Sequence, residues 1–221
     1  MFVAACKEFI HLLAILANDG TEWVFNPPST PHFGGKWEAG VKSVKHHLRR
    51  VEGDSLLTYE EFLTVLIQIE GVLNSRPLCP ISGDPSDVTA LTPGHFLTGE
   101  ALTSFPEPSL VHIPSSRLDM FQKVRQMLEH FWARWSREYM QRFQIVSKWL
   151  QPDSRLRVGS LVLVADERFP PCKWPLARVE EVHPGADGLV RVASVRMASG
   201  ATFRRPIVKL CLLPISDTGT D

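Results

Sequence analysis

Cysteine is scarce in this sequence, and its few cysteines are spread widely. The 221 residues hold four of them, Cys6, Cys79, Cys172 and Cys211, with no C-x-x-C pair. Disulfide-dependent secreted domains and cysteine-based zinc modules both need closely spaced cysteines. The spacing therefore favours neither, and it fits a protein that works in a reducing compartment.

Long hydrophobic runs are missing as well. No apolar stretch reaches the ~18–20 residues that a membrane-spanning helix needs. The opening MFVAACKEFIHLLAILANDG lacks the basic start of a secretory signal, and Glu8 and His11 interrupt its apolar run. We therefore expect a protein of the nucleus or cytoplasm that is not secreted.

Two common catalytic patterns are also lacking. There is no G-x-S-x-G, so a Ser-His-Asp hydrolase has no anchor. His11, His46 and His47 have no cysteine or histidine at a partner spacing, which argues against zinc. Several aspartates lie in turn-like contexts, where Asp is favoured for backbone reasons rather than as a metal ligand. These are Asp19, Asp54, Asp84 and Asp87.

Neither sign of charge is in excess, because 24 Lys and Arg balance 24 Asp and Glu. The balance hides an asymmetry between the two halves of the chain. Residues 1–110 carry 7 basic and 13 acidic residues, a net charge of −6, whereas residues 111–221 carry 17 and 11, a net charge of +6. The basic C-terminal half predicts contact with a polyanion.

Hydrophobic periodicity predicts three helices and a strand before residue 75. A helix is expected over residues 2–16, followed by a short strand at 21–25. Thr58 and Glu61 form a capping box for a helix over 58–74, which is apolar nearly all round and is expected to be buried. A further helix is expected between this strand and this helix, over residues 36–52. Its expected core-facing stripe consists of Trp37, Val41, Val44, Leu48 and Val51.

In the rest of the chain the hydrophobic periodicity changes twice. Residues 75–115, rich in Pro, Ser, Gly and Asp, predict an irregular connection with a helical turn near Leu97. Residues 116–150 predict one or two long helices, and their helically spaced aromatics favour a packing face over base-stacking platforms. These aromatics are Phe131, Trp132, Trp135, Tyr139 and Phe143.

Five short β segments follow Pro152, separated by Gly, Pro and Asp. Five antiparallel strands over residues 155–214 predict a small barrel of SH3-like size that folds independently. Its expected core is Val162, Val164, Val179, Val182, Val190 and Val192.

The junction NPPSTPHFGGKWEAGVKSVKHHLRR, residues 26–50, joins a rigid loop to a helix with one early acid. Glu38 falls in the first helical turn, and Lys42, Lys45 and Arg49 follow it along one stripe. A helix-dipole glutamate with one i,i+4 Glu–Lys pair accounts for this pattern without any function. A carboxylate that helps hold Mg²⁺, beside bases that hold phosphates, is the functional alternative.

Three stretches resemble the integrases of BEL/Pao-type LTR retrotransposons: PPSTPHFGGKWEAGVKSVKHHLRR, LNSRPLCPISGDPSDVTALTPGHFLTGE and KWPLARVEEVHPGADGLVRVASVRM. The resemblance implies an RNase H-like core that uses two aspartates and one glutamate, followed by a small C-terminal β domain. It matches Glu38 to that glutamate, as a catalytic residue and a ligand of Mg²⁺ or Mn²⁺. It matches Lys42 and Lys45 to helix positions that contact the DNA end of the element.

The same resemblance implies an order of domains. Residues 1–110 would be the C-terminal part of the RNase H-like core, 111–152 a helical linker, 153–215 the SH3-like barrel and 216–221 a disordered tail. The two aspartates and a zinc-binding module would precede Met1. We therefore expect a chain that does not bind Mg²⁺ productively, or cut and join DNA, by itself. It would self-associate or require the missing N-terminal part of an integrase.

Basic residues in the C-terminal half are the expected phosphate contacts, together with Arg49 in the helix over 36–52. They are Arg191, Arg196, Arg204, Arg205 and Lys209. Strict alternation along GLVRVASVRM would place Arg191 and Arg196 on opposite faces of their strand. Two other functions remain open: a non-catalytic DNA- or chromatin-binding module derived from a transposable element, and a scaffold or oligomerisation protein built on the aromatic helix.

Overall fold

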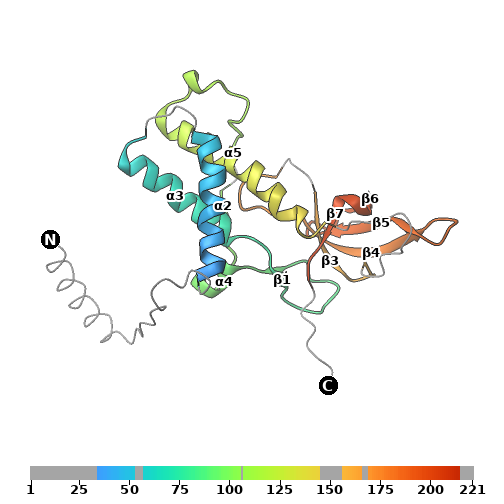
Figure 1. Cartoon of the computed structure of the whole chain (residues 1–221). Coiled ribbons are helices and arrows are strands. Elements are labelled where there is room, and N and C mark those ends of the chain that lie inside the picture. Colours follow the sequence, from blue (N-terminus) through green and yellow to red (C-terminus); the bar gives the residue numbers. More distant parts are fainter. Residues whose placement is uncertain (1–33, 53–56, 106, 145–155, 166–168, 215–221) are drawn as a thin grey trace, which may run out of the picture. The chain divides into compact units, whose positions relative to one another are not determined.

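The computed structural model describes residues 34–52, 57–105, 107–144, 156–165 and 169–214 (Figure 1). The predicted helix over 2–16, the strand at 21–25 and the tail 216–221 lie outside these residues. The chain divides into two compact units, Met1–Lys45 and His46–Asp221. Helical elements come first and a five-stranded antiparallel sheet comes last, which confirms the expected sequence of an α part and a β part.

Two predicted helices form with the expected bounds. Helix α2 spans Gly35–Glu52, and α3 spans Tyr59–Asn74. Both hydrogen bonds of the Thr58–Glu61 capping box are present, since Glu61 donates its N–H to Thr58 Oγ1 and Thr58 donates its N–H to Glu61 Oε2. This reciprocal cap satisfies backbone donors that the first helical turn leaves free.

The burial predicted for these helices is only partly right. Leu48 of α2 is buried, but Val41 is 51% exposed. In α3 the buried residues are Val65, Ile69 and Val72, whereas three others on a second stripe are exposed. Those three are Tyr59, Leu63 and Ile67. An apolar sequence shows that a helix can be buried, but its surroundings determine how many of its faces are covered.

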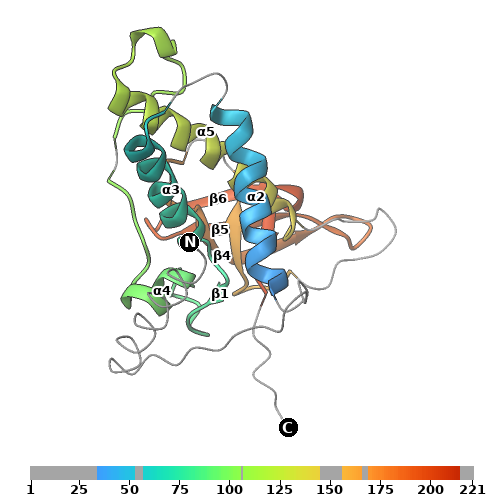
Figure 2. The same ribbon diagram turned by 60° about the vertical axis from the view of Figure 1, so that its left-hand side comes forward.

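The connection between α3 and α5 is irregular, as predicted. It contains the short strands β1 (Cys79–Pro80) and β2 (Ala90–Leu91), which pair with each other, and the helix α4 (Pro93–Thr98) around Leu97. The 3₁₀ turn η2 (Ser115–Arg117) precedes α5. Helix α5 spans Met120–Gln141 and packs against α3, with the two helices side by side in both views (Figures 1 and 2).

The five strands follow one another after residue 160. They are β3 (Leu161–Val164), β4 (Leu176–Pro184), β5 (Val190–Met197), β6 (Thr202–Pro206) and β7 (Leu210–Leu212), with the 3₁₀ turn η3 (Ile207–Lys209) before the last. Their order in the sheet is β6-β5-β4-β3-β7, and every pair is antiparallel. Five antiparallel strands were predicted. Within the described residues β6 and β7 are the two edges and do not pair, so the sheet is open there.

One face of the sheet carries the predicted core with one change. Val162, Val164 and Val179 are buried, and Val182 and Val190 pack partly buried against them. Val192 is not part of this cluster, and Ala193 and Val195 are instead. The reason is a register shift: His183 pairs with Val192 and Pro184 with Val190, which leaves Arg191 outside the pairing. A bulge of this kind breaks the alternation on which the prediction relied.

The opposite face of the sheet is also apolar, and segments outside residues 153–215 cover it. Leu161, Leu163, Cys211 and Leu213 form a second buried cluster with Val88 and Ala90, and Met140 and Phe143 pack against that cluster. The α3–α4 connection and the end of α5 are therefore part of the packing of the β domain. The sequence predicted a self-contained barrel and gave no sign of this second cluster.

Candidate nucleic-acid interface

The start of α2 presents one acid and three bases to solvent. Glu38 lies in the first turn, where the helix dipole favours a carboxylate. Its side chain and those of Lys42, Lys45 and Arg49 are all exposed. Among the described residues, no ion pair joins Glu38 to Lys42, so the i,i+4 pair of the non-functional interpretation is not formed. All three bases are thus placed to reach phosphates.

His47, which lies between Lys45 and Arg49 in α2, serves packing instead. Its side chain is buried, lies edge-on to the ring of Phe131 at 5.8 Å between centroids, and places Nε2 2.9 Å from Glu138 Oε2 of α5. The contact is off-axis, and neither ring nitrogen makes a well-directed hydrogen bond. Burial lowers the pKa of His47, and the nearby Glu138 carboxylate opposes part of that effect. A neutral His47 therefore joins α2 to α5.

Two of the five basic residues predicted as phosphate contacts in the β domain are engaged by acids. Arg191 binds Asp187 with both arms, Nη1 to Oδ1 at 3.0 Å and Nη2 to Oδ2 at 2.6 Å. This pairing lowers the pKa of Asp187 to about 2 and raises the pKa of Arg191. Arg196 pairs through Nε with Glu180 Oε1 at 2.9 Å and donates from Nη2 to the carbonyl of Pro85 at 2.8 Å. Part of the donors of each guanidinium is therefore already used by these partners.

The other three predicted basic residues lie on exposed or half-buried positions of β6 and η3. Arg204 is exposed on β6, opposite Ser194, and Lys209 is exposed on η3. Arg205 lies over the ring of Phe203, with 5.2 Å between its guanidinium carbon and the ring centroid. Because Arg204 and Arg205 are consecutive in a strand, they point to opposite faces of the sheet. The structure does not gather the five predicted basic residues of the β domain on one surface.

Arg178 was missed by the sequence prediction. It lies on β4, is 5% exposed, and donates three hydrogen bonds to backbone carbonyls. The acceptors are Asp87 O at 2.6 Å, Gly159 O at 2.7 Å and Ser82 O at 3.0 Å. A buried guanidinium needs such partners, and here they fasten the α3–α4 connection to the sheet. The only signal in the sequence was an arginine between apolar residues in PLARVEEV.

The aromatic residues of α5 form its packing face, as predicted. Phe131, Trp132, Trp135 and Tyr139 are buried. Trp174, from the segment before β4, contacts the rings of Trp132, Trp135 and Tyr139 edge-on, at 4.8, 5.9 and 5.4 Å between centroids. Tyr139 donates its hydroxyl hydrogen to Pro77 O at 2.7 Å, and burial raises the pKa of that phenol to about 12.

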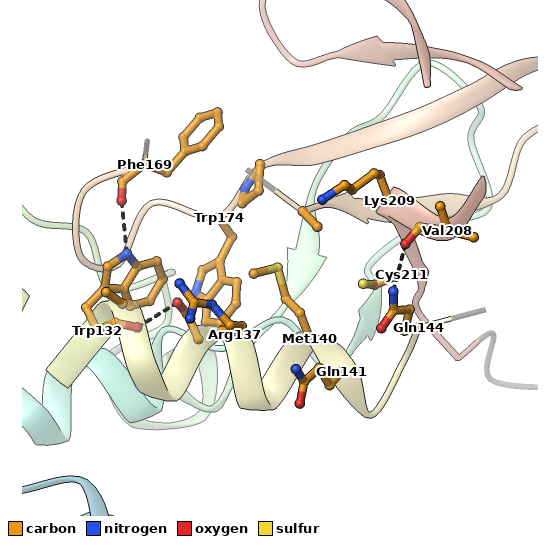
Figure 3. Close-up of a pocket in the computed structure, with 14 residues that line it drawn as sticks. Trp132, Arg137, Met140, Gln141, Gln144, Phe169, Trp174, Val208, Lys209 and Cys211 are labelled. Atoms are coloured by element: carbon orange, nitrogen blue, oxygen red, sulfur yellow. Dashed lines mark hydrogen bonds between the residues drawn. The ribbon is translucent and has the colours of Figure 1, made fainter. Parts of the chain in front are cut away.

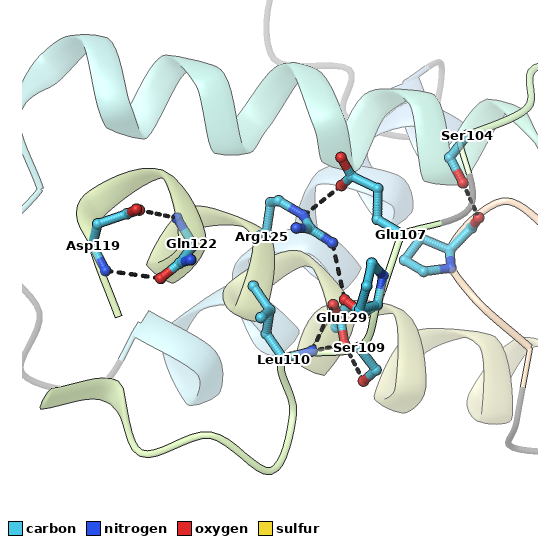
Figure 4. Close-up of polar contacts among 10 residues, drawn as sticks. Ser104, Glu107, Ser109, Leu110, Asp119, Gln122, Arg125 and Glu129 are labelled. Carbon is cyan, nitrogen blue, oxygen red and sulfur yellow. Dashed lines mark hydrogen bonds and ion pairs between the residues drawn. The ribbon is translucent and has the colours of Figure 1, made fainter. Parts of the chain in front are cut away.

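The first half of α5 is held to the preceding loop by polar contacts (Figure 4). Asp119 and Gln122 form a capping box. Glu129 accepts hydrogen bonds from the Ser109 hydroxyl at 2.6 Å and from the Leu110 N–H at 3.1 Å. Arg125 pairs with Glu107 at 2.7 Å. These contacts position the helix whose other end borders the sheet.

A cleft of about 510 Å³ lies between the second half of α5 and the sheet (Figure 3). Helix α5 contributes Trp132, Arg137 and Met140 to its lining. The sheet side contributes Phe169 and Trp174 from the segment between β3 and β4, and Lys209 from η3. Trp132 donates its indole N–H to Phe169 O at 2.9 Å, and Trp174 donates its own to Ser75 Oγ at 3.1 Å. The orientations of both indoles are thereby fixed.

Comparison with known proteins gives a match to a protein-family model. A protein-family model described as a family of unknown function (DUF5641) matches residues 119–213, which run from the N-cap of α5 to just beyond β7. No curated protein and no solved structure gives a significant match. Among the described helices, none is long and apolar enough to cross a membrane. The matched segment contains α5, the whole sheet and the cleft between them.

Proposed function

We propose that this chain is the C-terminal part of the integrase of a BEL/Pao-type LTR retrotransposon and that it binds DNA. In this proposal residues 1–110 end an RNase H-like core, 111–152 link the domains and 153–215 form an SH3-like β domain. The observation that carries the proposal is the exposed row of Lys42, Lys45 and Arg49 behind Glu38 on α2. The order of helices and antiparallel strands agrees with it.

The exposed basic side chains of α2 support phosphate contact, because none of them forms an ion pair with Glu38 within the described residues. Each Lys or Arg that reaches a phosphate releases condensed counterions, so DNA affinity falls steeply as salt concentration rises. These three side chains do not by themselves recognise a nucleotide sequence, since phosphate contacts position a protein without specifying nucleobases. Weakly sequence-specific, salt-sensitive binding of duplex DNA is therefore the expected behaviour.

Metal-dependent strand transfer is not assigned to this chain alone. Two-metal phosphoryl transfer needs several carboxylates around ions ~3.5–4 Å apart. Glu38 is a single exposed carboxylate, and the described residues hold no group of three His, Cys, Asp or Glu that could bind a metal ion. We therefore propose no catalytic step for this chain by itself.

Charge removal on α2 tests the proposal in the full chain. The variant combines Lys42→Gln, Lys45→Gln and Arg49→Gln. The control replaces three exposed bases outside α2, through Arg117→Gln, Arg157→Gln and Lys173→Gln. Fluorescence anisotropy on a blunt duplex across a salt series should show weaker binding and a salt slope shallower by about 2–3 for the α2 variant. Equal slopes for the unmodified chain, the α2 variant and the control would overturn the proposal.

A nicking and strand-transfer assay with Mg²⁺ or Mn²⁺ tests the catalytic part of the expectation. The full chain should show no activity, and Glu38→Gln should not change the result. Activity in the unmodified chain that Glu38→Gln abolishes would show that other acids complete a metal site. The burial of the aromatic residues of α5, several of which contact Trp174, supports a packing role for them within the chain, and a scaffold function stays an alternative.

A further inference from the structure

We infer that an exposed apolar stripe on α3 is an interface that binds helix α2 of a second copy of this chain. The stripe consists of Tyr59, Leu63 and Ile67, and between 42% and 74% of the surface of each residue is accessible. The inference goes beyond the proposed function and does not depend on it, because the contact joins two protein chains and its test contains no DNA.

The spacing of the stripe suits a helical partner. Tyr59, Leu63 and Ile67 follow one another at intervals of four residues, so they lie side by side along one face of α3. The buried residues of α3 lie on a different face, and α3 packs against α5. A contiguous apolar surface that the rest of the chain leaves exposed is typical of an interaction site. A straight stripe on a helix matches the exposed face of another helix.

Two glutamates border the stripe and determine which charge its partner must carry. Glu60 follows Tyr59 and Glu70 lies three residues after Ile67, so both belong to the exposed side of α3. Among the described residues, neither carboxylate forms an ion pair. Helix α3 contains three glutamates and no Lys or Arg, a net charge of −3. The complementary partner therefore presents basic side chains beside an apolar residue.

Helix α2 of a second copy has this combination. Val41 is exposed on α2, next to the exposed Lys42 and one turn before the exposed Lys45, and Arg49 follows one turn later. The sequence of α2 contains five Lys and Arg against two Glu, a net charge of +3 that balances the −3 of α3. Val41 would lie on the apolar stripe, while the basic side chains reach the two glutamates.

Helix α3 of a second copy is the less suitable occupant of the stripe. Two parallel α3 helices would place Glu60 beside Glu60, and two antiparallel ones would bring Glu60 towards Glu70. Like charges that face each other across an interface disfavour association. Neutralising the two glutamates would therefore strengthen a contact between two α3 helices, but it would weaken a contact between α3 and α2. This difference in sign separates the two modes of association.

Two charge-reversed full-length chains test the inference. One carries Glu60→Lys and Glu70→Lys, and the other carries Lys42→Glu and Lys45→Glu. In sedimentation velocity over a concentration series, the unmodified chain should show weak, concentration-dependent association, because a contact between two helices is small. Each reversed chain should associate at least about tenfold more weakly. An equal mixture of the two should recover association, since the basic α3 of one chain meets the acidic α2 of the other.

Matched controls reverse charges outside the two helices. They are Glu100→Lys with Glu181→Lys, and Arg117→Glu with Lys173→Glu, all at exposed positions. Both controls should associate like the unmodified chain. Circular dichroism should give the same spectrum for every variant, because only exposed side chains are changed.

Three results would overturn the inference. The first is an unmodified chain that sediments as a single copy at every concentration. The second is a mixture of the two reversed chains that associates no more strongly than either chain alone. The third is stronger association of the variant Glu60→Gln with Glu70→Gln, which would assign the stripe to a second α3. None of these results bears on DNA binding, so the proposed function is judged separately.

Discussion

Arg178 illustrates how a charged residue in a strand can serve a distant part of the chain. Its guanidinium binds the carbonyls of Ser82, Asp87 and Gly159, and its side chain is almost fully buried. Hydrogen bonds from a charged donor are among the strongest in proteins, and removing the donor leaves its acceptors unsatisfied. The loss should therefore exceed that of an ordinary surface arginine.

Replacement of this residue gives a direct test. Arg178→Met should lower the free energy of unfolding by about 3 kcal/mol, because three partly buried backbone carbonyls lose a charged donor. Arg204→Met, on an exposed position of the same sheet, should change it by less than about 0.5 kcal/mol. Chemical denaturation followed by circular dichroism measures both. An equal effect of the two substitutions would show that the connection over 82–87 does not depend on Arg178.

The residues that sequence could and could not identify differ in the range of their contacts. Thr58 and Glu61 are three positions apart, so their capping box follows from the local pattern, and the structure confirms it. Glu38 and the bases behind it were likewise placed on a helix from spacing alone. Arg178 meets carbonyls up to 96 positions away, and no local pattern shows that. The pairing of Arg191 with Asp187 depends on a hairpin turn and a bulge that alternation did not reveal.

At the level of elements, α3 shows the difference between hydrophobicity and burial. Its sequence FLTVLIQIEGVLN predicted burial all round, and the structure buries the stripe of Val65, Ile69 and Val72. The stripe of Tyr59, Leu63 and Ile67 is exposed, with 59% of Ile67 accessible. Helix bounds follow from capping and periodicity, but the number of covered faces depends on neighbours that the sequence of the helix does not specify.

Substitutions on the two stripes of α3 should therefore differ in their effect on stability. Ile67→Lys should leave the melting temperature almost unchanged and reduce any self-association, because it places a charge on an exposed apolar stripe. Val72→Ala should lower the free energy of unfolding by about 2 kcal/mol, since it leaves a cavity in a close-packed region. Differential scanning fluorimetry and size-exclusion chromatography with light scattering measure the two properties. A marked destabilisation by Ile67→Lys would mean that this stripe is covered in solution.

The sequence predicted the strands of the β domain well. It did not predict that other segments of the chain pack against this domain. Five successive antiparallel strands could be predicted from alternation and turn residues. The second buried cluster could not, because Val88 and Ala90 come from an irregular stretch rich in Pro, Ser and Asp. Irregular segments carry no periodicity, and their packing partners appear only in the folded chain.

At the scale of the whole molecule, the boundary of the folding unit differs from the boundary of the predicted barrel. Residues 82–90 bind Arg178 and cover Leu161 and Leu163, and Trp174 is enclosed by α5 and Ser75. Helices α3 and α5 and the sheet likewise belong to one compact unit, His46–Asp221. The sheet thus shares its interior with the α3–α4 connection and the end of α5, which precede it in the chain.

A comparison of fragments tests this boundary. A fragment of residues 150–221 exposes the apolar face of β3 and β7 and leaves the guanidinium of Arg178 without two of its three acceptors. Burying that guanidinium without its carbonyls is costly, and an uncovered apolar face promotes association. We therefore expect the fragment 150–221 to give a poorly dispersed ¹⁵N–¹H spectrum, whereas residues 57–221 give a dispersed spectrum and a cooperative thermal transition. Equal dispersion and equal melting temperatures for the two fragments would restore the self-contained barrel that the sequence predicted.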